Sequence, residues 1–323
     1  MPLDLSRYSV EEIRKHFLSQ ENSISPYSLT RLQRDSREGV RKIYQQLKKR
    51  QEKEKEERRR VESMLNLERV LWNSGVLKIA GADEVGVGPL AGPLVAAAVV
   101  FPPNPFILGV DDSKRLAPEM RQQLAQIIRE EAVGIGIGLV DVAQIDQLNV
   151  YQAGILAMRR AVENLPSRPD HLLLDAREIP GLSIPQSNVF KGDSICFSIA
   201  AASIIAKTCR DQLMIELDGP YPQYGFARNK GYCTPEHQKA IQRHGPSTIH
   251  RKSFTFIQEL CGEYSDLFYR LREKALRLDS AKAIDAFEKE FVGVRSQLSP
   301  RERRKIKLLL ARFWNRVQLS ELR

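Results

Sequence analysis

The sequence predicts an α/β fold, in which a sheet is flanked by helices, with a helical extension at each end of the chain. Between residues 73 and 258, short apolar runs alternate with helical patterns, which is typical of a sheet layered with helices. Before and after this segment the pattern is helical and rich in charge. We therefore expect a basic helical extension at 1–72, an α/β domain at 73–258 and a second basic helical extension at 259–323.

The N-terminal extension has the pattern of charged helices. Ser9 and Glu12 have the spacing of a capping box, and the apolar positions from Val40 to Leu47 repeat at the spacing of one helical face. The next run, KKRQEKEKEERRR at 48–60, carries both signs of charge, which can pair four residues apart on a solvated helix. We expect this run to be a connector or arm.

The middle segment carries the predicted strands. VLKIAGADE and PLVAAAVVFPP predict two strands that are joined by a tight, glycine-rich, hairpin-like loop. PDHLLLDA predicts a later strand. SIAAASIIAKTCRDQLMIEL, from Ser198, predicts a helix of small residues that can pack closely on the sheet.

The C-terminal extension begins its last helix at a predicted cap. Ser299, Pro300 and Glu302 supply the cap, a first-turn proline and the capping-box partner. The helix that follows would bury one apolar stripe, and the stripe consists of Ile306, Leu309, Leu310, Phe313 and Trp314.

Four acidic residues stand at the ends of these predicted elements. Asp83 and Glu84 close the first strand, Asp175 closes a later strand, and Asp193 precedes the small-residue helix. Because sites in open sheets form outside strand ends, the four carboxylates could converge. Converging carboxylates must protonate or hold cations, and Mg²⁺ and Mn²⁺ prefer oxygen ligands. The set therefore predicts a divalent-metal site, although each acid taken alone is more typical of a cap or a turn.

The net charge of +10 is concentrated in the two extensions. Residues 1–72 hold 17 basic against 12 acidic side chains, residues 259–323 hold 15 against 10, and the middle holds 18 of each. A polyanion such as nucleic acid would be attracted mainly by the extensions, although charged helices can also be simply solvated.

Other features limit the location and the chemistry. The apolar runs are too short to span a bilayer, and the N-terminal stretch lacks a secretory pattern, so we expect a cytoplasmic protein.

The sequence has no GxSxG, P-loop or HExxH motif that would indicate another chemistry. His237, His244 and His250 are poorly spaced for metal ligation from one helix, and we expect them in packing or phosphate contacts. The cysteines lack CxxC spacing and are expected to be reduced thiols; they are Cys196, Cys209, Cys233 and Cys261.

Strand-end acids in a basic protein favour two-metal phosphodiester hydrolysis. One ion would lower the pKa of an attacking water, and the other would stabilise the leaving oxygen. Six blocks of the middle segment, taken in order from about residue 77 to residue 256, together resemble bacterial ribonuclease HII. They are GADEVGVGPLAGP, VDDSKRLAPEMR, LLLDA, FKGDS, IAAASIIAKTCRDQLM and YPQYGFARNKGYCTPEHQKAIQRHGPSTIHRKSF. The charged helix before them is similar to the extension of longer members.

The resemblance implies a ribonuclease H-like fold, with a mixed, mostly parallel sheet flanked by helices. It implies a metal-dependent endonuclease that cuts the RNA strand of RNA–DNA hybrids and nicks duplex DNA 5′ to an embedded ribonucleotide. The products would carry 3′-hydroxyl and 5′-phosphate ends, which would suit ribonucleotide excision repair. We expect a monomer without a membrane partner. The C-terminal helix could use Phe313 and Trp314 to dock on the catalytic core or on a protein partner, and the sequence does not choose between these.

The resemblance also assigns residues. Two Mn²⁺ or Mg²⁺ ions would be held by the catalytic acids Asp83, Glu84, Asp175 and Asp193. Contacts to the substrate would come from Gly86, Val87, Gly88, Ser113, Lys114 and Tyr232. Of these, Tyr232 would stack on the sugar next to the ribonucleotide, and Ser113 and Lys114 would contact backbone phosphates.

Two positions depart from the family pattern. Val87 stands where the family has arginine between two glycines, so backbone readout of the ribose 2′-hydroxyl is kept and one phosphate contact is lost. A charged hydrogen bond is worth about 1.5–3 kcal/mol, so incision at a single ribonucleotide would weaken roughly ten- to a hundredfold unless valine is tolerated. Ile195 replaces a frequent lysine, for which we have no physical account. The alternative is a hybrid- or duplex-binding protein with weakened or junction-independent cleavage.

Overall fold

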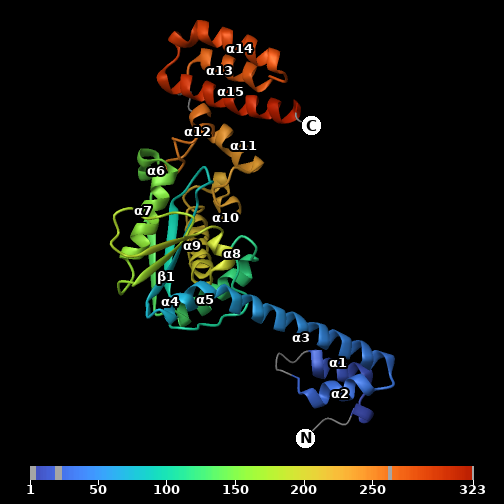
Figure 1. Ribbon diagram of the computed structural model, residues 1–323. Coiled ribbons are helices and arrows are strands. Elements are labelled where there is room, and N and C mark those ends of the chain that lie inside the picture. Colours follow the sequence, from blue (N-terminus) through green and yellow to red (C-terminus); the bar gives the residue numbers. More distant parts are fainter. Residues whose placement is uncertain (1–4, 19–23, 261–263, 322–323) are drawn as a thin grey trace. The chain divides into compact units, whose positions relative to one another are not determined.

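The strands of the computed structural model form one five-stranded sheet in the order β3–β2–β1–β4–β5 (Figure 1). The structure describes residues 5–18, 24–260 and 264–321. β1 runs antiparallel to β2 and parallel to β4, and β4 runs parallel to β5. The predicted mixed, mostly parallel sheet flanked by helices is confirmed. The strands are β1 (Ile79–Val85), β2 (Leu94–Val100), β3 (Gly134–Val140), β4 (His171–Asp175) and β5 (Gln186–Val189).

The helices follow the expected alternation with the strands. The α-helices are α1 (Val10–Leu18), α2 (Pro26–Arg34), α3 (Glu38–Met64), α4 (Asn66–Asn73), α5 (Pro118–Glu131), α6 (Val142–Leu148), α7 (Val150–Glu163), α8 (Gly192–Ile195), α9 (Phe197–Glu216), α10 (Phe226–Asn229), α11 (Pro235–His244), α12 (Thr255–Leu260), α13 (Asp266–Leu276), α14 (Ala281–Val294) and α15 (Pro300–Glu321). Short 3₁₀ turns are η1 (Leu5–Arg7), η2 (Pro222–Tyr224) and η3 (Arg295–Gln297).

The chain divides into two compact units. The first comprises residues 1–85, 95–138 and 155–208, and the second comprises 86–94, 139–154 and 209–323. This division follows contacts between residues, whereas the predicted boundaries after residues 72 and 258 follow charge and composition. Those predicted boundaries stay a prediction.

The core of the first unit forms around α9. Every residue of β2 is buried, and its alanines and valines pack with the small residues of α9 and with α5. Gly81 in β1 has no room for a side chain, because a Cβ there would collide with the backbone of Ser198 and Ile199. The first turn of α9 therefore lies directly against β1. This close approach confirms the predicted role of the small-residue helix.

The N-terminal helices have a core of their own. Ile13, Phe17, Leu32 and other apolar residues of α1, α2 and α3 form one cluster. The predicted capping box is present, because the Ser9 nitrogen donates to Glu12 Oε2 at 2.8 Å and the Glu12 nitrogen donates to Ser9 Oγ at 3.3 Å. Beyond Leu47, α3 continues as a mostly exposed charged helix, as predicted.

The C-terminal helices α13, α14 and α15 also share a core. The stripe predicted for α15 is confirmed, because Ile306 and Leu310 are buried in this core while Phe313 and Trp314 pack against it. The predicted capping box is present as well, and its Glu302 carboxylate accepts from the nitrogens of Ser299 at 2.7 Å and Ser265 at 2.6 Å.

Two further expectations concern the described residues. None of their helices combines the length and the apolar character that crossing a membrane requires. Cys196, Cys209 and Cys233 are free thiols, as predicted. Cys261 lies outside the described residues.

Candidate active site

Three of the predicted acids lie at the carboxyl ends of two neighbouring strands. Asp83 and Glu84 lie near the end of β1, and Asp175 ends β4. The parallel register pairs Ala82 with Leu174, so Asp83 and Asp175 are the next residues along the two strands. The adjacent strands thus bring these carboxylates to the same edge of the sheet.

Asp193, the fourth predicted acid, lies in the short helix α8 and is buried. The nitrogen of its neighbour Gly192 donates to Asp175 Oδ1 at 2.9 Å, which joins α8 to the end of β4. The four acids therefore belong to one region of the first unit, and three elements position them.

The environment of these acids disfavours their charged forms. Burial raises the pKa of Asp83 well above its ordinary value, and the charges of Glu84 and Asp175 raise it further. Burial also raises the pKa of Glu84 and of Asp175, and the charge of Asp193 adds to the shift at Asp175. The fold thus holds carboxylates together at an electrostatic cost.

Two basic side chains partly offset this cost. Lys114 Nζ lies 3.1 Å from Asp193 Oδ2, and Arg177 Nη1 lies 3.2 Å from Glu84 Oε1. The Ser113 hydroxyl is buried and lies 2.8 Å from the hydroxyl of Ser203. Lys114 is therefore better placed than Ser113 to meet a phosphate from solvent.

The oxygen donors of these acids suit a divalent cation, but their side chains are not arranged around one point. Within the described residues, no group of three or more carboxylate, imidazole or thiol side chains is arranged to hold a metal ion. Lys114 and Arg177 instead contact two of the acids. The available donors are nevertheless carboxylate oxygens with unfavourable mutual repulsion, which suits a hard ion such as Mg²⁺ or Mn²⁺.

A cavity of about 350 Å³ opens beside two of these acids, and Asp83 and Glu84 are not among its lining residues. Asp175 and Asp193 line it together with Lys114, and so does Phe190, whose side chain is 76% exposed. Sequence reasoning missed Phe190, Arg177, Arg115 and Lys191, of which all but Arg177 line the cavity. Ala176 and Lys191 have φ values of 55° and 56°, a strain that is common at functional sites. No local sequence pattern marks that strain.

Other predicted contact residues lie in the second unit. Gly86 has a φ of 98°, and a Cβ there would collide with the Arg210 side chain. Gly88 lies beside the ring of Tyr232, which is 39% exposed. The Val87 carbonyl accepts from Arg251 Nη1 at 3.2 Å. The structure therefore places the glycine loop beside Tyr232, and the substrate contacts that the resemblance implied for these residues stay a prediction.

Two buried arginines hold this loop, and sequence reasoning missed both. Arg251 donates to the carbonyls of Val87, Gly92 and Pro93, and Arg210 donates to those of Ala91, Pro93 and Lys230. Burial lowers the pKa of Arg251 to about 9, so its guanidinium stays protonated at neutral pH. The arginines are therefore a framework for the loop that contains Val87.

Two buried histidines lie behind the backbone of Tyr232 in sequence of contact, because His237 contacts Tyr232 and His250 contacts His237. His237 Nδ1 lies 2.8 Å from the Tyr232 carbonyl, and the Nε2 atoms of His237 and His250 lie 3.1 Å apart. Both imidazoles are fully buried, so of the two expected roles, packing or phosphate contact, the structure favours packing for this pair. His244 is exposed at the end of α11. Ile195 is also exposed, at 53%.

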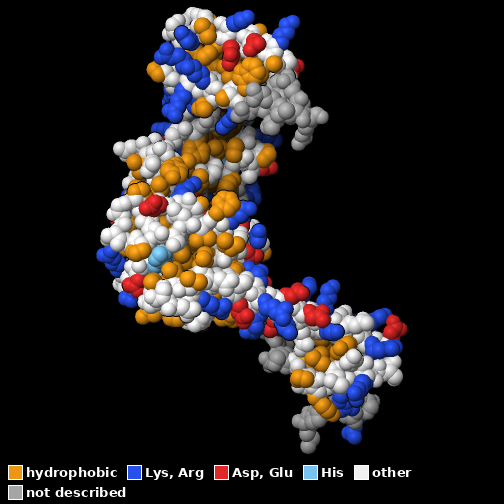
Figure 2. Space-filling model, in the orientation of Figure 1, with side chains coloured by type: hydrophobic (Ala, Val, Ile, Leu, Met, Phe, Trp, Pro, Cys, Tyr) orange, Lys and Arg blue, Asp and Glu red, His pale blue; other side chains and the backbone are white. Residues whose placement is uncertain are grey.

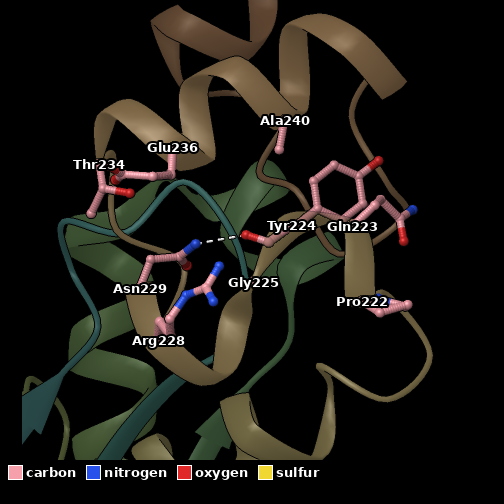
Figure 3. A pocket seen from close by; sticks show the side chains of 9 residues that line it. All are labelled: Pro222, Gln223, Tyr224, Gly225, Arg228, Asn229, Thr234, Glu236 and Ala240. Atoms are coloured by element: carbon pink, nitrogen blue, oxygen red, sulfur yellow. Dashed lines mark hydrogen bonds between the residues drawn. The ribbon is translucent and has the colours of Figure 1, made fainter.

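A second cavity, of about 460 Å³, lies among η2, α10 and α11 (Figure 3). Tyr224, Arg228, Asn229 and Glu236 are among its lining residues, and the Asn229 amide donates to the Tyr224 carbonyl at 2.6 Å. None of the predicted catalytic acids lines this cavity. It is therefore not the candidate active site.

Comparison with known proteins gives consistent matches. Residues 80–257 match the family model of ribonuclease HII, and residues 9–72 match that of the ribonuclease HII N-terminal domain. Ribonuclease HII of Myxococcus xanthus is 45% identical over 259 residues, which are 80% of this chain and 88% of that protein. Ribonuclease HII of Geobacillus thermodenitrificans is 47% identical over 261 residues, which are 81% of this chain and 100% of that protein. The crystal structure of ribonuclease H2 from Pyrococcus horikoshii aligns with a TM-score of 0.48 at 24% identity, over 57% of this chain and 97% of that one.

Proposed function

Because the chain belongs to the ribonuclease HII family, we propose that it is a divalent-metal-dependent endonuclease that cuts the RNA strand of RNA–DNA hybrids. It would also nick duplex DNA on the 5′ side of an embedded ribonucleotide and leave 3′-hydroxyl and 5′-phosphate ends. The observation that carries the proposal is the set of mutually repelling carboxylates at the ends of β1 and β4.

We assign the catalytic role to the four acids. Asp83, Glu84, Asp175 and Asp193 would hold two Mg²⁺ or Mn²⁺ ions, which would activate the attacking water and stabilise the leaving oxygen. The side chain of Ser203 hydrogen-bonds to Asp83, and the Gly192 nitrogen donates to Asp175, so neighbouring groups orient both carboxylates. Lys114, near Asp193, would contact a backbone phosphate.

We propose that the second unit reads the ribonucleotide. Backbone groups of Gly86, Val87 and Gly88 would contact the 2′-hydroxyl, and the ring of Tyr232 would stack on the neighbouring sugar. Arg251 holds the Val87 carbonyl, so the backbone of this loop is fixed even though the arginine of the family pattern is absent. The alternative, a binding protein with weakened cleavage, depends on how much the missing phosphate contact matters.

Cleavage of two duplexes tests the proposal. One duplex carries a single ribonucleotide and the other a run of several, and both are incubated with Mg²⁺ or Mn²⁺. Incision 5′ to the single ribonucleotide is expected if Val87 is tolerated. Cleavage only within the run would show that junction recognition is lost, and the absence of metal-dependent cleavage of both would favour the binding-protein alternative.

We also propose that the basic extensions add affinity for nucleic acid. Lys and Arg side chains gather over the C-terminal helices in Figure 2. Phe313 and Trp314 are partly buried and pack against the C-terminal core, and Trp314 Nε1 lies 3.3 Å from Glu288 Oε1. Since these aromatic side chains already contact the core of the C-terminal helices, docking on a protein partner through them is the weaker alternative.

A further inference from the structure

Glu68 is a buried acid that comes from the N-terminal extension rather than from the sheet. It lies on α4 and is only 2% exposed. Its Oε1 atom accepts hydrogen bonds from the Ser198 nitrogen at 2.9 Å, the Ser198 hydroxyl at 2.8 Å and Cys196 Sγ at 3.2 Å. Its Oε2 atom is buried without a hydrogen-bond partner. Such a buried carboxylate is costly, so its position calls for a role.

The three donors belong to the start of α9. The first nitrogens of a helix have no partner within the helix, and the positive end of the helix dipole favours a negative charge there. Hydrogen bonds to an ionised carboxylate are stronger than those between neutral groups. Glu68 therefore fixes the first turn of α9 from a segment 130 residues away in sequence.

The first turn of α9, which Glu68 fixes, adjoins the two elements that carry Asp83 and Asp193. Ser198 lies against Gly81, two residues before Asp83 in β1. Asp193 lies on α8, which ends at Ile195, and Cys196 directly follows it. Further along α9, Ser203 hydrogen-bonds to Asp83. A shift of this turn would therefore move the surroundings of Asp83 and Asp193 together.

We infer that Glu68 is a positioning residue for the acid site, through which the N-terminal extension sets the geometry that divalent ions require. This inference rests on the proposed function, because it assumes that the acids hold those ions. It gives the N-terminal extension a role in forming the site, beyond the positive charge that it contributes.

Two substitutions and a matched control test the inference in the full-length chain. Glu68→Ala removes the acceptor, Glu68→Gln keeps one acceptor oxygen, and Glu62→Ala removes an exposed acid at the end of α3. Changes in residues that orient metal ligands typically cost roughly 10–100-fold in metal affinity or activity. For Glu68→Ala we expect a loss of this size in kcat and in apparent Mn²⁺ affinity, with KM for the duplex little changed. Glu68→Gln should recover most of it, and Glu62→Ala should match the wild type.

The rise in melting temperature on adding Mn²⁺ gives a readout that does not need turnover. Glu68→Ala should require about tenfold or more additional Mn²⁺ for the same rise. If its kcat and Mn²⁺ dependence equal those of the wild type while only the metal-free melting temperature falls, Glu68 is a structural cap and the inference is overturned. A change confined to KM would overturn it as well.

The test also covers a Glu68→Ala variant that does not fold and a wild type that does not cleave. If Glu68→Ala does not fold, Ser198→Ala removes one of the three donors, and the same shift of Mn²⁺ dependence, smaller in size, is expected; an unchanged dependence would overturn the inference. If the wild type cleaves neither duplex, the proposed function fails. The Mn²⁺-induced stabilisation of the wild type and of Glu68→Ala then still decides whether Glu68 positions an ion site.

Discussion

Asp83 in the first unit and Arg251 in the second are both buried beside a group of like charge, but the protein treats them differently. Arg251 donates to the carbonyls of three residues and stays protonated at neutral pH, although the charge of Arg210 is close by. Asp83 faces Glu84 and Asp175, and burial raises its pKa well above the ordinary value. The fold satisfies the buried arginine with its own backbone, whereas the buried acids keep raised pKa values beside one another.

Under the proposed function, the difference is one between a structural charge and a functional one. A buried charge that is fully hydrogen-bonded holds its neighbours in place, and here the neighbours form the Val87 loop. A buried charge that remains costly is typical of a site built for an external ligand. Substituting one member of each group should therefore change the free energy of unfolding in opposite directions.

The largest effect is expected for Asp83→Asn. Under the proposed function Asp83 holds metal, so its loss would remove several kcal/mol of transition-state stabilisation and cleavage should fall about a thousandfold or more. The free energy of unfolding without divalent ions should stay the same or rise, because a repelled buried charge is removed. Cleavage kinetics and urea unfolding measure the two effects, and a loss of stability that parallels the loss of activity would contradict a functional role.

Arg251→Met should show the reverse pattern. The carbonyls of Val87, Gly92 and Pro93 would lose donors. Leaving buried acceptors unsatisfied costs about 1–3 kcal/mol each, so we expect the free energy of unfolding to fall by about 2–5 kcal/mol. Urea unfolding measures this fall.

The matched control is Arg243→Met on the exposed face of α11, which should change the free energy of unfolding by less than about 0.5 kcal/mol. If Arg251→Met were as stable as that control, the carbonyl contacts would not be structural and the contrast with Asp83 would fail.

A smaller, pH-dependent effect is expected beside Arg251. Burial lowers the pKa of His250 to about 4, and the charge of His237 contributes to the shift. Well above pH 6.5 this imidazole is neutral in both the folded and the unfolded state. As pH falls from about 6.5 toward 4, the unfolded chain gains the proton first, so stability should decrease by up to about 3 kcal/mol.

His250→Gln should flatten this pH dependence in urea unfolding measured from pH 7 to pH 4.5. His244→Gln is the control, because His244 is exposed and its loss should leave the slope unchanged. An equally steep curve for His250→Gln would show that the buried pair does not set the acid sensitivity of the second unit.

Features that depend on local spacing could be predicted from the sequence. The Ser9–Glu12 and Ser299–Glu302 capping boxes follow from spacing within one helical turn, and the structure contains both. The apolar runs predicted β1, β2 and β4, so the acids at their ends could be placed at one edge of the sheet. The assignment of these acids to catalysis still rests on the resemblance and stays a prediction.

Features that depend on distant contacts could not be predicted. Glu68 lies in the short helix α4, where no local pattern marks it, and only the approach of Ser198, 130 residues later, makes it a buried cap. Arg251 lies among polar residues, and the acceptor Gly92 is 159 residues away. Phe190 gives no local sign that it is exposed beside Asp175 and Asp193. Sequence spacing fixes neighbours within an element, whereas these roles come from elements that meet only in the folded chain.

The smallest effects on stability should come from exposed charges, in contrast to the buried Asp83 and Arg251. Arg304, Lys307 and Arg312 lie on the exposed face of α15, and no ion pair of theirs occurs among the residues that the structure describes. The one acid of α15 before residue 315 is Glu302, which is buried in its capping role. These side chains should therefore act only through long-range attraction to phosphates.

Replacing Arg304, Lys307 and Arg312 together with glutamine should leave the free energy of unfolding nearly unchanged, within about 0.5 kcal/mol. If each contacts a phosphate, the slope of log K against log salt should become shallower by up to about 0.9 per residue, as fluorescence anisotropy with a labelled duplex would show. Glutamine at Arg277, Lys282 and Lys289 makes the same charge change on exposed positions of the same unit. An equal change of slope in both variants would mean that net charge, and not the face of α15, attracts the duplex.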